Sequence, residues 1–322
     1  MQLPTLADIE AAAALVYRQF PATPQYRWGQ LCQRLGTECW VKHENHTPVG
    51  AFKIRGGLVY FEQLARAQAL PHAVVSATRG NHGQSIAWAA RAHAVACAIV
   101  VPLGNSREKN ASMRALGAEL IEHGSDFQAA REHAAQLAAE RGALLVPSFH
   151  PDLVRGVATY WWEFLRALPA LDLAYVPIGL GSGACAAVAA KRALGHPVRL
   201  VGVISRHATT YADSFAAGRV TPAPVTTELA DGVAVRVADA DALALLRPAL
   251  ARIVQVDDAE VATAMRALFA DTHNAAEGAG ALALAAALQE KEQLHGLAVG
   301  LPLTGANVDS AVFAQVLAGG HA

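Results

Sequence analysis

Residues 171–194 read LDLAYVPIGLGSGACAAVAAKRAL and join an apolar run, a glycine-rich turn and an alanine-rich segment. An apolar run bounded by turn residues is typical of a strand covered on both faces, and an alanine-rich stretch favours a helix. The turn between them would present unpaired N–H groups at the positive end of the helix dipole, which suits a phosphate. This unit indicates an α/β fold with a ligand site at its turn.

The same alternation of apolar runs and helical stretches extends along the chain. Besides the run at 171–179, strands are expected at 38–44, 72–77, 96–102, 117–123, 142–149, 198–205, 252–257 and 296–305. Amphipathic helices are expected between them, for example at 126–141 and 258–271. Near-continuous apolar strands separated by helices predict parallel sheets in an α/β architecture. The candidate ligand loops fall into two separated sets, which leaves room for two sheets.

Composition excludes several classes of protein. A chain of 322 residues can hold one large domain or two, and 53% of its residues are hydrophobic. The net charge is −1 and no basic stripe is present, which argues against nucleic-acid binding. No apolar run reaches the roughly 18 residues of a membrane span, and no signal peptide is apparent. Cys32, Cys39, Cys97 and Cys185 lack CxxC spacing, so reduced thiols in a cytoplasmic protein are expected.

A lysine in an apolar, glycine-punctuated stretch is the first candidate functional residue. The stretch HENHTPVGAFKIRGG, residues 43–57, places Lys53 between Phe52 and Ile54, just ahead of an expected helix. Desolvation disfavours the ammonium form, so a lysine kept among apolar neighbours loses its charge easily. A neutral amine is what a Schiff-base nucleophile requires. The alternative is a stray lysine at the start of a helix.

Two further loops follow expected strands, where an open α/β sheet binds its ligands. TRGNHGQSIAWAA, residues 78–90, offers the side chains of Asn81 and His82 near the start of a helix. LPLTGANVDS, residues 301–310, offers the hydroxyl of Thr304. Each loop taken alone could be ordinary turn chemistry.

The glycine turn also has a competing interpretation. Gly179, Gly181 and Ala184 satisfy the dinucleotide fingerprint G-x-G-x-x-A after a strand and before a helix. An NAD site would require an acidic residue about 20 positions further on, at the end of the next strand. That strand ends in Ser205 and Arg206, which disfavours NAD but leaves an NADP-dependent oxidoreductase open.

Taken together and in order, these segments resemble the fold-type II pyridoxal-phosphate enzymes, specifically the serine/threonine dehydratase and serine racemase group. TPVGAFKIRGG resembles that family's lysine motif, GNHGQSIAWAA its asparagine loop, VPIGLGSG its phosphate loop, and LTGANVD its closing Ser-Gly-Gly-Asn. The resemblance runs from about Thr23 to Asp309. It implies two open parallel-sheet α/β domains with the cofactor between them. Residues 1–72 and 151–322 would form the large cofactor-binding domain, and 73–150 a small mobile domain.

The resemblance also implies roles for individual residues. Lys53 would hold pyridoxal 5'-phosphate as a Schiff base and then move the Cα proton of the substrate. Asn81 would bind the cofactor's 3-hydroxyl, and Thr304 would face its ring nitrogen. The remaining implied cofactor contacts are Phe52, Gly179, Leu180, Gly181, Ser182 and Gly183. The implied substrate contacts are Thr78, Arg79, Gly80, Asn81 and His82.

The implied reaction is α,β-elimination from a β-hydroxy amino acid of the threonine or serine type, which yields a 2-oxo acid and ammonia. A hydroxyl such as that of Thr304 cannot hold the ring nitrogen protonated, and the resulting weaker electron sink suits a prompt elimination. Alternatives are dehydration of a bulkier or acidic substrate, such as 3-phenylserine or 3-hydroxyaspartate, and amino-acid racemisation. Arg55 and the paired glycines after it disfavour the interpretation as a cysteine-synthase-type enzyme. The presence of Lys53 disfavours the interpretation as a non-catalytic amino-acid sensor. The resemblance implies a homodimer, and the short tail leads us to expect no C-terminal regulatory domain.

Two departures from the family pattern alter these expectations. Ile204 replaces the glutamate of the metal-binding members, and Thr209 and Thr210 stand near the expected acids, so no divalent-metal site is expected. Arg79 stands where serine racemases have serine, which weakens the racemase alternative. Its guanidinium could bind the substrate α-carboxylate, bind a second acid group, or stack on an aromatic side chain; it could instead face solvent or pair with a nearby acid of the protein.

Overall fold

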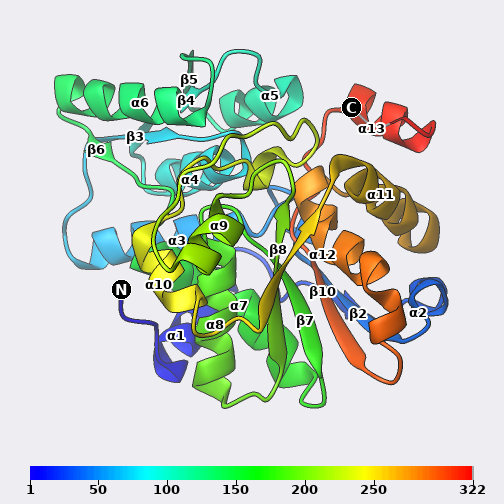
Figure 1. Ribbon diagram of the computed structural model, residues 1–322. Coiled ribbons are helices and arrows are strands. Elements are labelled where there is room, and N and C mark those ends of the chain that lie inside the picture. Colours follow the sequence, from blue (N-terminus) through cyan, green and yellow to red (C-terminus); the bar gives the residue numbers. More distant parts are fainter. Residues whose placement is uncertain (321–322) are drawn as a thin grey trace.

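The computed structural model describes residues 1–320, which form two open sheets with helices on their faces. A six-stranded sheet has the order β1-β2-β10-β7-β8-β9, and a four-stranded sheet has the order β5-β4-β3-β6. In Figure 1 the smaller sheet lies above the larger one, between helices α4, α5 and α6. The predicted α/β architecture with parallel sheets is confirmed.

The larger sheet consists of β1 (Gln25–Tyr26), β2 (Glu38–His43), β7 (Leu173–Pro177), β8 (Arg199–Ser205), β9 (Arg252–Val256) and β10 (Ala298–Leu303). The smaller consists of β3 (Ala73–Ala77), β4 (Ala96–Val101), β5 (Glu119–Glu122) and β6 (Leu144–Leu145). Every neighbouring pair is parallel except β1 with β2. All nine predicted strands are confirmed. The sequence interpretation missed β1, because two residues are too few to show a pattern.

One or two helices separate most successive strands. Their bounds are α1 (Leu6–Val16), α2 (Gly29–Leu35), α3 (Lys53–Arg66), α4 (Asn81–Ala92), α5 (Arg107–Ala115), α6 (Phe127–Arg141), α7 (Pro151–Ala167), α8 (Ser182–Leu194), α9 (Thr210–Ala217), α10 (Ala240–Leu246), α11 (Asp258–Thr272), α12 (Gly278–Gln289) and α13 (Ser310–Leu317). The predicted helices at 126–141 and 258–271 correspond to α6 and α11. Both begin at an aspartate, Asp126 or Asp257, whose side chain accepts a backbone N–H of the first turn.

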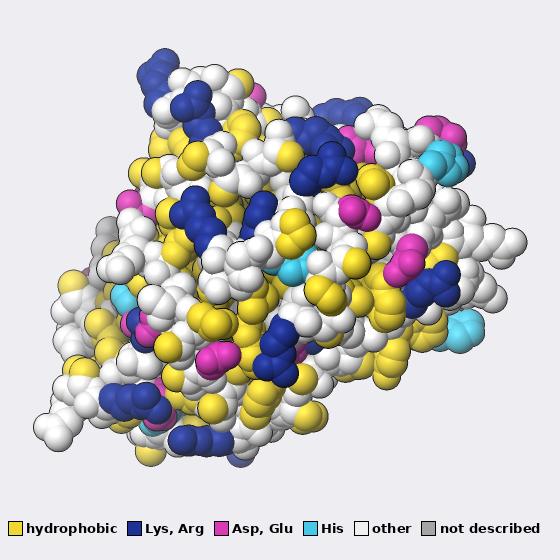
Figure 2. All heavy atoms as spheres, turned by 90° about the horizontal axis from the view of Figure 1, so that it is seen from below, with side chains coloured by type: hydrophobic (Ala, Val, Ile, Leu, Met, Phe, Trp, Pro, Cys, Tyr) yellow, Lys and Arg dark blue, Asp and Glu magenta, His cyan; other side chains and the backbone are white. Residues whose placement is uncertain are grey.

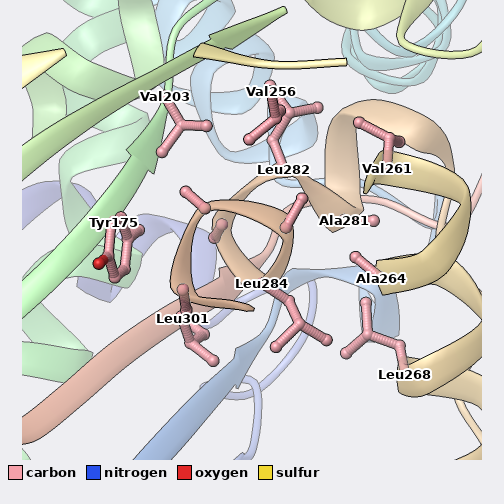
Figure 3. Close-up of a cluster of buried hydrophobic side chains, with 14 of the residues drawn as sticks. Tyr175, Val203, Val256, Val261, Ala264, Leu268, Ala281, Leu282, Leu284 and Leu301 are labelled. Atoms are coloured by element: carbon pink, nitrogen blue, oxygen red, sulfur yellow. The ribbon is translucent and has the colours of Figure 1, made fainter. Parts of the chain in front are cut away.

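One hydrophobic core of the larger unit is built around the alanine-rich helix α12, and a second is built around α7 and α8. Figure 3 shows Leu282 and Leu284 of α12 among Tyr175 and Leu301 of the sheet on one side and Leu268 of α11 on the other. Residues 278–287 of α12 are all buried, and their small alanine side chains let the helix approach both the sheet and α11 closely. The abundance of alanine therefore reflects dense helix–sheet packing.

Helices α3 and α7 cross at closely apposed glycines, and this contact fixes the helix that begins with Lys53. A Cβ on Gly56 would lie 3.0 Å from the backbone oxygen of Leu153, and a Cβ on Gly156 would overlap the backbone oxygen of Arg55. Backbone atoms cannot rotate away as a side chain can. The glycines therefore permit the approach that positions the start of α3.

We expect Gly156→Ala to destabilise the protein, because the new methyl group must displace the first turn of α3. Overpacking of this kind costs about 1–3 kcal/mol, which a urea unfolding curve would detect. Gly29→Ala is the matched control, since a Cβ there meets no atom within 4 Å. A Gly156→Ala protein as stable as the control would contradict the close α3–α7 contact.

The sequence predicts neither a membrane-spanning helix nor a basic stripe in this chain. No helix within residues 1–320 is both long and apolar enough to cross a bilayer. Lys and Arg side chains lie in separate clusters among hydrophobic and acidic groups on the face that Figure 2 shows. Cys32, Cys39, Cys97 and Cys185 form no disulfide with one another in the structure.

Candidate active site

The loops that follow β3, β7 and β10 meet at one cavity, here called the central cavity, of about 110 Å³. Carboxyl ends of parallel strands are where open α/β sheets bind ligands. The sequence-predicted residues that line it are Phe52, Lys53, Thr78, Arg79, Gly80, Asn81, His82, Gly179, Leu180, Gly181, Ser182, Gly183 and Thr304. Every residue in the predicted site thus lines a single cavity, although they come from segments up to about 250 positions apart in the chain.

Lys53 is the first residue of α3, and its amine is removed from solvent. Burial lowers the pKa of Lys53 to about 8, although the charge of Glu277 acts to raise it. The amine donates to the hydroxyl of Ser182 at 2.9 Å, and it lies 5.1 Å from the centre of the Phe52 ring. No carboxylate forms an ion pair with Lys53 within residues 1–320. A substantial fraction of Lys53 is therefore neutral near pH 8, as a nucleophile requires.

This depressed pKa predicts the pH dependence of Lys53 reactivity in the cofactor-free protein. Only the neutral amine reacts, so trace acetylation of Lys53 should rise with pH around a midpoint of about 8. Mass spectrometry of the labelled peptides would give this midpoint, with exposed Lys291 as an internal reference. Glu277→Gln should lower the midpoint further, because it removes a charge that favours the ammonium form. A midpoint at the ordinary lysine value of 10.5 would contradict the buried placement.

The glycine-rich turn after β7 opens onto the same cavity at the start of α8. Gly181 adopts a φ of +113°, which favours glycine, and α8 begins at Ser182. The first N–H groups of a helix have no partner within that helix. Tyr211 holds the turn by donating to the carbonyl of Leu180 at 2.8 Å, and Trp161 donates to that of Gly183 at 3.1 Å. The turn is a rigid anion cradle of the kind that a phosphate group requires.

A network of hydrogen bonds fixes the side-chain amide of Asn81. Its Nδ2 donates to Oε1 of Glu277 at 2.6 Å, and its Oδ1 accepts from Nδ2 of Asn307 at 2.8 Å. Asn307 itself donates to the carbonyl of Val49 at 2.8 Å, so its own orientation is set. The oxygen of Asn81 is therefore occupied, and its second amide N–H remains to donate to a ligand.

Glu277 belongs to a buried group of charges at the wall of the cavity. Lys109 lies 3.2 Å from Glu277 and 2.7 Å from Asp231, and all three line the cavity. Burial raises the pKa of Glu277, an effect that Lys109 opposes. Burial acts to lower the pKa of Lys109, but the two carboxylates raise it well above its usual value. Lys109 is thus a permanently charged lysine beside a lysine that is readily neutral.

The other predicted residues take differing positions around the cavity. Thr78 accepts hydrogen bonds from the N–H groups of Gly80 at 2.8 Å and Gly83 at 3.2 Å, so its hydroxyl braces the asparagine loop. Burial lowers the pKa of His82 to about 3, which keeps its imidazole neutral. Thr304 is buried at the end of β10, and its hydroxyl makes one long contact of 3.4 Å to the carbonyl of Ala279. The Thr304 hydroxyl is available for a stronger partner.

Arg206, which left the NADP alternative open, lies away from this cavity. It forms ion pairs with Asp257 at 3.4 Å and Glu260 at 3.9 Å at the molecular surface, and it does not line the cavity. Among residues 1–320 no three His, Cys, Asp or Glu side chains are grouped as a metal site would require.

A second buried charge cluster anchors the start of α3. Arg55 is fully buried, and its guanidinium contacts Glu44 at 2.7 Å and Glu163 at 2.6 Å. Lys42 also pairs with Glu163, at 2.6 Å. The sequence interpretation treated Arg55 only as a family marker, and it missed Glu277, Lys109 and Asp231 altogether. A usable signal existed for Glu277, since it is a lone acid in the apolar segment AAEGAGALALAAAL.

The sequence of this chain is similar to those of known pyridoxal-phosphate dependent enzymes. The family model "Pyridoxal-phosphate dependent enzyme" matches residues 17–305. An L-threonine ammonia-lyase from Geobacter sulfurreducens is 36% identical over 86% of this chain and 69% of its own length. An L-threo-3-hydroxyaspartate ammonia-lyase from Saccharomyces cerevisiae is 30% identical over 99% of this chain and 98% of its own. The chain spans 58% of two biosynthetic L-threonine dehydratases that it also matches.

A solved structure has the same fold as this chain. Maize serine racemase superimposes with a TM-score of 0.90 at 26% identity, covering 99% of this chain and 98% of the racemase. The donor set also fits the cofactor, because one cavity contains a lysine that is readily neutral, an anion cradle and a free amide N–H. The chain belongs to the family of pyridoxal-phosphate dependent enzymes, and pyridoxal 5'-phosphate is its cofactor.

Proposed function

We propose that this enzyme is an ammonia-lyase that dehydrates a β-hydroxy amino acid to a 2-oxo acid and ammonia. The observation that carries the proposal is the placement of Lys53, an amine with a depressed pKa that faces a hydroxyl and an anion cradle in one cavity. The names of two relatives, an L-threonine ammonia-lyase and an L-threo-3-hydroxyaspartate ammonia-lyase, support the reaction class.

The chain offers a donor for each part of the cofactor. Lys53 would bind it covalently, and the N–H groups at the start of α8, with the hydroxyl of Ser182, would hold its phosphate. The free N–H of Asn81 would bind its 3-hydroxyl, and the hydroxyl of Thr304 would face its ring nitrogen. When bound, the cofactor supplies the electron sink that makes the Cα–H bond of the substrate acidic.

The residues of the chain then bind the substrate and move its protons during the elimination. The unpaired N–H groups at the start of α4, at Asn81 and His82, bind the substrate α-carboxylate. Lys53 takes the Cα proton with its neutral amine, and the hydroxyl on Cβ departs with a proton as water. Hydrolysis of the resulting enamine releases ammonia and the 2-oxo acid. The neutral imidazole of His82 adds no positive charge that would hinder proton uptake by Lys53.

A product assay on the purified enzyme tests the proposal. L-serine, L-threonine, L-threo-3-hydroxyaspartate and 3-phenylserine would be supplied separately, and 2-oxo acid, ammonia and substrate chirality would be measured. We expect equal amounts of 2-oxo acid and ammonia from at least one substrate. Chiral inversion without ammonia would replace the proposal with racemisation.

We further propose the domain division, a homodimer and a cytoplasmic location. Residues 1–72 and 151–322 would form the large domain, and 73–150 a small mobile one. The confinement of the four-stranded sheet to 73–145 supports this division. Asp309 accepts hydrogen bonds from Ser106 Oγ and from the N–H groups of Arg107 and Glu108, so these bonds would have to break if the small domain moved away from the end of the chain. The dimer rests on the family resemblance, and the location on the four free thiols.

A further inference from the structure

A second cavity, the arginine annex, adjoins the central cavity. The two share Arg79, Phe127, Leu180, Ala234 and Val235 as common walls. The annex has a volume of about 170 Å³ and lies between the start of α6 and the segment 225–237. A substrate group that projects beyond the central cavity past Arg79 would enter this space.

The annex carries an excess of positive charge. Arg79, Arg131 and Arg236 line it, against one carboxylate, that of Asp126. Asp126 is already engaged, because it pairs with Arg236 at 3.0 Å and caps α6. Within residues 1–320 no acid forms an ion pair with Arg79 or Arg131. The annex therefore attracts anions toward the central cavity.

Arg79 differs from an ordinary surface arginine, because part of its guanidinium is buried. It is half-buried at the junction of the two cavities, and its Nε is fully shielded from solvent without an acceptor among residues 1–320. A buried donor without a partner costs free energy unless a ligand supplies the acceptor. A guanidinium can bind a carboxylate through two parallel hydrogen bonds.

The acceptor that Arg79 lacks need not be the substrate α-carboxylate. The start of α4, which follows Arg79 and Gly80, has no side-chain cap, so the N–H groups of Asn81 and His82 are open to that carboxylate. An aromatic substrate side chain would stack on the guanidinium but would leave Nε without an acceptor. A second carboxylate on the substrate supplies the acceptor and matches the charge of the annex.

We propose that the enzyme is selective for a β-hydroxy amino acid with a second carboxylate, which Arg79 binds at the mouth of the annex. This inference rests on the proposed function, since it names the substrate class of the same site. Arg131 and Arg236 strengthen the positive field, and Arg79 makes the direct contact.

Equilibrium binding of amino acids without a leaving group tests the subsite separately from turnover. L-aspartate and L-alanine would be titrated into the holoenzyme and followed by the cofactor absorbance. We expect L-aspartate to bind at least about tenfold more tightly, and Arg79→Met to remove that preference. Arg79→Lys should restore it only in part, because an ammonium is a poor bidentate donor. Arg192→Gln, at an exposed arginine that lines neither cavity, is the matched control.

Turnover gives the second measurement. Arg79→Met should lower kcat/KM for L-threo-3-hydroxyaspartate at least about tenfold more than for L-threonine. Equal losses for both substrates would overturn the proposal in favour of an α-carboxylate contact, and unchanged values would overturn it in favour of a structural arginine. The parent enzyme could instead prefer 3-phenylserine and lose that preference in Arg79→Met. This result would overturn the proposal in favour of an aromatic substrate group that stacks on the guanidinium. If no β-hydroxy amino acid yields a 2-oxo acid while Arg79-dependent aspartate binding persists, the proposed function fails and the subsite stands.

Discussion

Replacing Lys53 by alanine is expected to abolish turnover while leaving the fold intact. In the proposed mechanism this amine would perform both the covalent attachment and the proton transfer, and proton transfer alone contributes about 10²–10⁴-fold to rate. We therefore expect kcat to fall by at least about a thousandfold. The fold should survive, because the amine has Ser182 as its hydrogen-bond partner and no buried carboxylate loses an ion pair with it. Steady-state kinetics together with circular dichroism would check both expectations.

Lys291→Ala is the control for this experiment, because Lys291 is exposed, pairs with Glu292 and does not line the cavity. It should keep the activity and the yellow colour of the parent protein. A Lys53→Ala protein that retained a tenth of the parent activity would rule out the assigned role. A colourless parent that became active with NADPH would instead favour a dinucleotide site at the glycine turn.

Replacing Arg55 by methionine should cause the largest loss of stability of any substitution considered. Arg55 is fully buried between the carboxylates of Glu44 and Glu163, and it also donates to Thr159 at 2.9 Å. Methionine keeps most of the volume but leaves two buried carboxylates, for which Lys42 is the one remaining ion-pair partner within residues 1–320. Removing one partner of a buried ion pair costs about 3–5 kcal/mol. Urea unfolding of the parent and variant proteins would measure this loss.

Comparing the stability loss of Arg55→Met with that of a substitution in an exposed ion pair isolates the effect of burial on stability. Arg66 pairs with Glu62 on the surface of the same helix at 2.9 Å, so Arg66→Met should cost no more than about 0.5 kcal/mol. Glu44→Gln combined with Arg55→Met should recover part of the stability, because one buried charge is then removed. A loss below about 1 kcal/mol for Arg55→Met would show that the cluster does not anchor α3.

Much of the fold could be predicted because its strands are nearly continuous apolar runs. Residues 199–205 and 298–303 are buried along almost their entire length, so they show no polar alternation and stand out between polar or glycine-containing connecting segments. The two-residue strand β1 has no such run, and it exists because Gln25 and Tyr26 pair with β2. Strand order was equally inaccessible, since β10 inserts between β2 and β7 from the far end of the chain.

The site was predictable where a local motif and a strand end coincide. Asn81, Thr304 and the glycine turn each follow a strand, so the topology brings them together. Lys109 could not be recognised in this way, because SREKNAS reads as a solvated helix start, and only tertiary packing places its amine between Asp231 and Glu277. Such long-range charge pairing leaves no periodic trace in a sequence.

The central claim is that Lys53 holds the cofactor, and mapping the attachment site tests it most directly. Borohydride reduction of the holoenzyme would fix the pyridoxyl group, and mass spectrometry of the digested chain would locate it. Lys109 lines the same cavity and is the natural competitor, but its two carboxylate partners keep it protonated, whereas Lys53 titrates near pH 8. We predict the label on the peptide that contains Lys53. A label on Lys109, or on any other lysine, would contradict the account.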